Sequence, residues 1–432
     1  MRARASTRAA LIATLLAAGC SDSVHPPLPS FTIAPANQWS GGTITIRSSY
    51  FANRAVTPVI VAAAETLALS PIDDSTARTQ LPQGPSEPVA FLLARGKARD
   101  SLGTVNRVGF SARRTIQPAL YGELLATDSA GDPRVFGGTF TGTFNREPIV
   151  RLNVVAGQSR ILTLRQPSNT QYGMAPSVIP GAFTVRDATD SLRLASLLVA
   201  TPVIVDSMHW AGTGFTRHVS LLQAGSWLMT TSHWSFVRFD TGGTTPNVLT
   251  ESPWAVYMSP RGDRTTLATA VSGTTGNGVP VFDNGTGAVA YVLPLLTTET
   301  AAFSPDGATL YAAGGYFTSD TLVAVNAATG QLLREKVRLP AGFNAMGMAY
   351  RQAGDGQLLV GATDSTRLVL LVYRASTLEL LGVLPTLDGC PLMQAGPCFS
   401  GVVSVDEAHN AAYIVTPESP TTIWKFDLLS GP

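Results

Sequence analysis

The sequence is poor in charge, in cysteine and in long apolar runs. Charged residues make up 14% of its 432 residues, against about 25% in an average soluble domain, so long charged helices are not expected. Because 30 Lys and Arg balance 29 Asp and Glu and no basic stripe is present, nucleic acid is not expected as a partner. No stretch approaches the length of about 18 unbroken apolar residues that predicts a membrane-spanning helix.

Common catalytic motifs are also missing. The patterns G-x-S-x-G, H-E-x-x-H and G-x-x-x-x-G-K-[ST] do not occur. The segment D-N-G-T-G at 283–287 begins like a calcium loop but lacks the later oxygen ligands and the terminal Glu. The R-G-D at 261–263 matches an integrin ligand, but it stands where a related segment carries a turn. We therefore predict no catalytic residue, no metal ligand and no cofactor.

Glycine and proline, by contrast, are plentiful. The chain has 40 Gly and 29 Pro, which indicates many turns and favours an all-β fold. Its length exceeds what one hydrophobic core usually supports, so two or more domains are expected.

The N-terminus has the pattern of an export signal. Residues 1–8 carry three Arg and no acid, and the apolar run at 9–19 is too short to span a bilayer. The stretch L-A-A-G-C at 16–20 resembles the bacterial lipobox. The resemblance implies a signal peptide over 1–19 and a lipid on Cys20, with Ser21 favouring the outer membrane over the inner one. An ordinary secretory signal is the alternative.

Two cysteines stand close together near the C-terminus. Cys390 and Cys398 flank a loop that contains Pro and Gly, and in an oxidising compartment this spacing predicts a local disulfide. The alternative is half of a zinc site, which would need two more ligands, and no His or Cys stands nearby at a suitable spacing.

A repeat occupies much of the chain. The segments that begin at 254 and 301 align along their length, with S-P-R-G at 259–262 over S-P-D-G at 304–307 and Asp283 over Asn326, 43 residues later. Periods of about 40 to 50 residues with four short strands are typical of propeller blades. Asp or Asn followed by Gly suits the turn between the third and fourth strands. Further copies of this turn are expected at Asn153, Asp187, Asp240, Arg374 and Asp427.

On these repeats, residues 109–432 resemble β-propellers of the YVTN type, which are related to WD-type and quinoprotein propellers. The seven turn positions indicate seven blades, with six as the alternative because the first interval is short for a full blade. The last copy stops before its fourth strand, so an earlier segment such as 107–112 or 160–164 is expected to complete the last blade.

The region before the repeats has a different pattern. Residues 31–108 resemble the IPT/TIG domain, an Ig-like β-sandwich, through Pro35, the Gly pair at 41–42, the T-I-T-I strand at 43–46, Phe51 and the L-P-x-G at 81–84. Residues 20–30 form a short polar, Pro-rich tether.

One stretch, 208–236, is rich in His and Trp. His209, Trp210, His233 and Trp234 are candidates for a ligand-binding face that would suit a sugar or an aromatic ligand. The alternative is that these large aromatic side chains pack between neighbouring blades.

The sequence therefore predicts an envelope lipoprotein that acts as a non-catalytic binding or scaffolding module through loops on one face of the propeller, with the Ig-like domain as a spacer or second contact. Its partners would be the membrane, through the lipid, and a protein or glycan ligand of unknown identity. The alternative from another class is a propeller enzyme of the periplasm, either a metal-dependent lactonase or lyase or a quinone-dependent dehydrogenase.

We expect Cys20→Ser to release the protein from membranes, because each buried CH2 of an acyl chain contributes roughly 0.8 kcal/mol to membrane binding. Immunoblots of membrane and soluble fractions after a carbonate wash measure the change, and Ser21→Ala is the control that should stay with the membranes. A Cys20→Ser protein that still pellets after the wash would contradict the lipoprotein interpretation.

Overall fold

The computed structural model describes residues 30–52, 58–95 and 97–115, the strands between 121 and 258, and residues 259–430 with short gaps and without 387–401. The regular elements in these ranges are β-strands and one 3-10 helix, η1 (Ser49–Ala52). The all-β expectation is confirmed for this part of the chain. None of its helical segments has the length and apolar character needed to cross a membrane.

The N-terminal unit, residues 32–108, consists of two sheets that share one core. Their strand orders are β1-β3-β7-β6 and β2-β9-β8-β4-β5. The strands are β1 (Thr32–Ala34), β2 (Asn37–Trp39), β3 (Thr43–Arg47), β4 (Val59–Ala62), β5 (Glu65–Thr66), β6 (Ser70–Pro71), β7 (Thr76–Gln80), β8 (Glu87–Arg95) and β9 (Ala98–Val108). Alternation in β3 buries Ile44 and Ile46 in one cluster with Phe91 of β8, as expected when successive side chains point to opposite faces.

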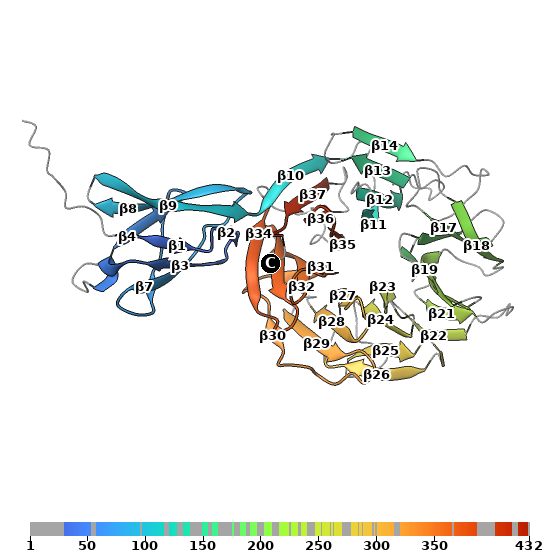
Figure 1. The fold of residues 1–432 in the computed structure, drawn as a ribbon. Helices are drawn as coiled ribbons and strands as arrows, with labels where there is room; N and C mark the ends of the chain where they lie inside the picture. The colour runs from blue at the N-terminus through green and yellow to red at the C-terminus, as the bar shows by residue number, and fades with distance from the viewer. Residues whose placement is uncertain are drawn as a thin grey trace, which may run out of the picture.

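The rest of the described chain forms seven four-stranded sheets arranged around a ring (Figure 1). Strands that follow one another within a sheet pair antiparallel, as in β11–β14, and six of the seven described sheets run in sequence order as simple up-and-down meanders. The first three complete sheets comprise β11 (Tyr121–Thr127), β12 (Pro133–Gly138), β13 (Ile149–Asn153) and β14 (Gln158–Leu162); β15 (Ala175–Pro176), β16 (Ala182–Arg186), β17 (Ser191–Ser196) and β18 (Val203–His209); and β19 (Thr216–Gln223), β20 (Ser226–Thr231), β21 (Ser235–Phe239) and β22 (Asn247–Glu251).

The next three sheets are β23 (Pro253–Met258), β24 (Arg264–Thr269), β25 (Val279–Asp283) and β26 (Val289–Leu293); β27 (Thr300–Phe303), β28 (Thr309–Gly314), β29 (Thr321–Asn326) and β30 (Val337–Arg338); and β31 (Asn344–Arg351), β32 (Gln357–Thr363), β33 (Leu368–Arg374) and β34 (Leu380–Pro385). The seventh contains β35 (Val402–Asp406), β36 (Ala411–Thr416), β37 (Thr422–Asp427) and a strand from much earlier in the chain, β10 (Phe110–Thr115).

The closure expected from the sequence is confirmed. The strand β10, which overlaps the expected segment 107–112, pairs antiparallel with β37 over Phe110↔Phe426 to Thr115↔Thr422. It is the outer strand of the last sheet, so the two ends of the repeat region meet in one set of backbone hydrogen bonds. The other candidate segment, 160–164, overlaps β14 of a different sheet.

The third strands give the ring its period. They end at Asn153, Ser196, Phe239, Asp283, Asn326, Arg374 and Asp427, so successive ends are 43 to 53 residues apart.

One of the expected turn positions is wrong. Asp187 follows β16, the second strand of its sheet, whereas the third strand β17 ends at Ser196. The next six residues read L-L-V-A-T-P and contain no Asp, Asn or Gly. They therefore lack the residues from which the turn was predicted in the other sheets.

Where the turn residues are present, they act as their chemistry predicts. The Oδ1 of Asn326 accepts hydrogen bonds from the backbone N–H groups of Ala328 and Thr329 at 2.9 and 3.1 Å. Gly330 then takes a left-handed conformation, with φ of +74°, which glycine adopts without steric cost. At Asp283 the N–H of Thr286 plays the same part and lowers the pKa of the carboxyl.

The inner hairpin turn at 304–307 is built in a similar way. The hydroxyl of Ser304 donates to Asp306 and accepts from the N–H of Thr309 at 2.9 Å. Gly307 has a φ of +65° and lies against Ser259 of the preceding sheet. The turn at 304–307 therefore also contacts the neighbouring sheet.

The middle strands of the β27–β30 and β31–β34 sheets are buried on both faces. In β33 the six residues from Leu368 to Tyr373 are all buried, and β29 and β32 are nearly continuous apolar runs as well. Strands covered on both sides lose the apolar–polar alternation, as expected for sheets that stack against their neighbours around a ring.

We expect Gly330→Ala to destabilise the protein by roughly 3 kcal/mol, because it combines a left-handed backbone with overlap between the new methyl group and the ring of Tyr291. Gly342→Ala is the matched control: its φ is +87°, but the nearest atom to an added Cβ is 4.0 Å away, so we expect about 1 kcal/mol. Urea unfolding curves of both variants measure the difference. Equal losses would show that the Tyr291 contact contributes nothing.

Candidate functional site

The site residues chosen from the sequence lie mostly outside the described residues. This is so for Cys20, for Cys390 and Cys398, and for Trp210, His233 and Trp234. Of the proposed ligand face, the structure describes only the backbone of His209, which ends β18 and pairs with Ser191. The ligand face and the disulfide therefore stay predictions.

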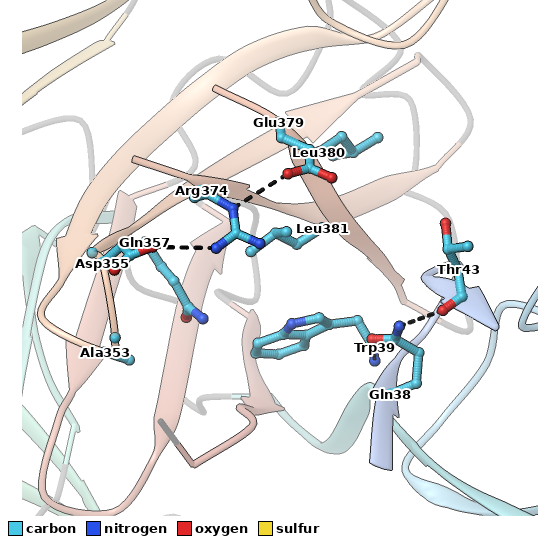
Figure 2. A pocket seen from close by; sticks show the side chains of 12 residues that line it. Gln38, Trp39, Thr43, Ala353, Asp355, Gln357, Arg374, Glu379, Leu380 and Leu381 are labelled. Atoms are coloured by element: carbon cyan, nitrogen blue, oxygen red, sulfur yellow. Dashed lines mark hydrogen bonds and ion pairs between the residues drawn. The ribbon is translucent and has the colours of Figure 1, made fainter. Parts of the chain in front are cut away.

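The described residues instead form a cleft where the N-terminal unit meets the ring. Its volume is about 410 Å³, within the usual range for small-molecule and side-chain pockets. One wall comes from Gln38, Trp39 and Thr43, and the other from the turn and strand start at 353–357, Arg374 and residues 379–381 (Figure 2).

The wall from the N-terminal unit is a tight turn stabilised by its own side chain. The Nε2 of Gln38 donates to the carbonyl of Thr43 at 2.6 Å, and its Oε1 accepts the N–H of Trp39 at 2.8 Å. Gly42 lies so close to Gln38 that an added Cβ would be 2.7 Å from the amide carbon. The Gly pair that suggested a domain family thus has a local steric role.

Trp39 packs this wall against the ring. Its side chain is 4% exposed and belongs to the same apolar cluster as Leu370 and Leu384 of the ring. Gly382 of β34 lies against its Cβ, where a larger residue would overlap it. Next to it, the carbonyl of Ser40 accepts the N–H of Val383 at 2.8 Å.

Three charged side chains line the opposite wall. Arg374 lies between Asp355, 3.4 Å from its Nη1, and Glu379, 3.3 Å from its Nε (Figure 2). Strong charge-assisted bonds are about 2.7–2.9 Å long, so these are weak, and the two carboxylates are 70% and 62% exposed. The cleft carries one net negative charge and, at Leu380, an exposed apolar side chain.

A buried arginine supports this wall from behind. The side chain of Arg351 is 1% exposed, and its guanidinium donates to Gln357 at 2.9 Å and to Asn410 at 2.6 Å. Burial lowers the pKa of Arg351, and Glu407, 3.7 Å away, acts in the opposite direction. Because Asn410 and Glu407 belong to the next sheet, Arg351 also joins two sheets.

The lining of the cleft can form hydrogen bonds, ion pairs and apolar contacts. Its described side chains offer carboxylates, a guanidinium, amides and leucines, and no group of three or more His, Cys, Asp or Glu among the described residues could hold a metal ion. Sequence analysis missed the cleft because its residues come from three segments that are far apart in the chain and have no shared motif.

Comparison with known proteins identifies the fold of the ring. The chain is similar to the β-propeller domain of Cps50 (Swd1) from Myceliophteria thermophila, with a TM-score of 0.50 and 10% identity over 74% of this chain and 100% of that one. It is also similar to a chain in the crystal structure of the mitotic checkpoint complex, with a TM-score of 0.52 and 12% identity over 78% and 97%. At these identities the likeness shows the fold alone, that of a β-propeller. No protein-family model and no curated sequence matches the chain.

We expect Arg351→Met to cost roughly 3 kcal/mol, because it leaves the amides of Gln357 and Asn410 without their donor. Arg367→Met is the matched control, since the ion pair of Arg367 with Asp364 is 53% exposed on the arginine side and should contribute less than about 1 kcal/mol. Chemical denaturation of the two variants gives both values. Similar small losses in both would show that the buried network is not stabilising.

Proposed function

We propose that this protein is a non-catalytic binding module of the cell envelope, held to a membrane by lipid on Cys20, and that it binds its ligand in the cleft between the N-terminal unit and the ring. The observation that carries the proposal is the construction of the cleft. Its two walls come from separate units, yet Trp39 and the backbone bond between Ser40 and Val383 hold them together. Ligand sites occur preferentially at such domain boundaries.

We further propose that the ring is a seven-bladed propeller over residues 109–432. The seven described sheets, the repeat of 43 to 53 residues between third strands and the pairing of β10 with β37 support this number. A ring of six blades would leave one of the seven sheets without a place.

The N-terminal unit is proposed to be an Ig-like domain of the IPT/TIG kind over residues 31–108. Two features support this assignment: the two facing sheets with a shared core, and the positions of the motif residues. The L-P-x-G motif at 81–84 forms the loop around the buried Arg107, whose Nη1 donates to the carbonyls of Pro82 and Gln83.

The ligand we propose is a polypeptide segment with a lysine or arginine side chain. Such side chains have an apolar stem and a cationic head. The stem would contact Leu380 and Leu381, and the head would lie near Asp355 and Glu379, whose carboxylates bind Arg374 only weakly. The net negative charge of the cleft favours a cation over an anion.

This ligand class predicts opposite effects for the charges of the cleft. We expect the D355N/E379Q double variant to weaken binding roughly 5- to 10-fold, since exposed pairs contribute about 0.2–1 kcal/mol each. Arg374→Gln should strengthen it about 3-fold, because it removes the competing cation. Fluorescence anisotropy with ten-residue peptides that share an apolar background and carry one Lys, one Arg, one Glu or no charge measures these changes.

The control is the E65Q/E335Q double variant, which changes the net charge equally but at exposed residues outside the cleft. It should bind like the wild type. Preferential binding of the Glu peptide, abolished by Arg374→Gln, would overturn the basic-peptide class, and no binding of any peptide would overturn the cleft as a peptide site.

A further inference from the structure

The ring closes where β10 pairs with β37 in the last sheet, and the N-terminal unit contacts both this sheet and the neighbouring β31–β34 sheet. We call this β10–β37 pairing the seam; β10 is the outer strand of the last sheet. In Figure 1 the N-terminal unit lies beside β34 and β10, at this point of the ring. A domain joined only by a flexible linker would have no such contacts.

The closing strand is a direct continuation of the N-terminal unit. Strand β9 ends at Val108 and β10 begins at Phe110, with Gly109 between them. The carbonyl of Gly109 accepts the N–H of Asp427 at 2.9 Å, so this linking residue already belongs to the last sheet. No flexible segment separates the two units.

Ser86 of the N-terminal unit holds this connection in place. Its hydroxyl accepts the N–H of Gly109 at 3.0 Å, and its own N–H donates to the carbonyl of Phe110 at 3.1 Å. Arg107, which is 4% exposed, stabilises the segment 82–87 that contains Ser86. It donates to the carbonyls of Pro82, Gln83 and Pro85 and forms an ion pair with Glu87.

Ser40 joins this connection to the neighbouring β31–β34 sheet. It is fully buried; its N–H donates to the carbonyl of Val108 and its carbonyl accepts the N–H of Val383, both at 2.8 Å. Its hydroxyl accepts the N–H of Gly84 at 2.9 Å. One residue thus links the end of β9, just before the closing strand, to β34 of the neighbouring sheet.

Apolar contacts follow the same path. Trp39 belongs to one cluster with Leu370 and Leu384 of the β31–β34 sheet and with Phe110 and Trp424 of the last sheet. The rings of Phe110 and Trp424 meet edge to face, with centroids 5.8 Å apart. The cluster therefore spans the seam.

We infer that the N-terminal unit is a clasp that keeps the propeller closed. Strand β10 continues directly from this unit, and Trp39 and Ser40 bind the unit to β34, so contacts outside the last sheet hold β10 beside β37. The inference goes beyond ligand binding, because it would hold for any ligand or for none.

The test changes each partner of the contact between Trp39 and Gly382 in the full-length protein. Trp39→Ala removes the inserted side chain, and Gly382→Ala places a methyl group against the Cβ of Trp39 without changing the N-terminal unit. Hydrogen exchange followed by mass spectrometry reports on the seam, Phe110–Thr115 and Thr422–Asp427. We expect exchange there to become at least 10-fold faster in both variants, while β28 and β29 keep wild-type protection.

The control is Leu310→Ala in β28, a fully buried residue in a sheet away from the seam. It should lower the melting temperature without selective exchange at the seam. Wild-type protection of the seam in Gly382→Ala and in folded Trp39→Ala would overturn the clasp. A uniform increase in the exchange rate across the ring, as in Leu310→Ala, would also overturn the clasp, because it would indicate general destabilisation. If Trp39→Ala does not fold, the Gly382→Ala variant, which leaves the N-terminal unit unchanged, gives the result alone.

Discussion

The contact of Trp39 and Ser40 with β34 is the interaction on which the rest of this structure depends. It buries a large aromatic side chain among leucines of the ring and adds a backbone hydrogen bond between units. Burying a side chain of this size contributes about 1.5–3 kcal/mol or more, a large part of the net stability of a typical domain. The cleft and the seam both lie beside this contact, so one junction positions the two.

Low charge and many buried strands leave the protein few ways to join its sheets through ion pairs. Besides the side-chain bonds of Arg351, three polar links between neighbouring described sheets use backbone carbonyls: Tyr291 donates to the carbonyl of Ala327 at 3.0 Å, Arg334 to that of Ala375 at 2.9 Å and Lys336 to that of Pro294 at 2.8 Å. Carbonyls at turns are available for this because they have no partner within the strand ladder. The turns therefore stabilise the sheets laterally as well as reversing the chain.

Much of the fold could be predicted because the turn chemistry is local. Asn326 and Gly330 specify their turn through atoms within four residues, and the apolar strands between such turns give the period. The same reasoning failed at Asp187, where a polar residue follows a second strand, and at Ser196, where a third strand ends without the usual turn residues. Turn residues predict the end of the third strand only in those sheets that use the same turn chemistry.

The sequence by itself determined the all-β class, the repeat and the need for an early strand to complete the last sheet, since strand alternation, turn residues and a missing fourth strand are properties of short segments. Only the tertiary structure decided that Trp39 packs against Gly382, that Ser40 bonds to Val383 and that Arg374 shares a cleft with Gln38. More than 330 residues separate the partners in each pair. The local sequence around each partner looks like that of an ordinary turn or strand. The pairs form because two folded surfaces have complementary shapes, which no local sequence pattern specifies.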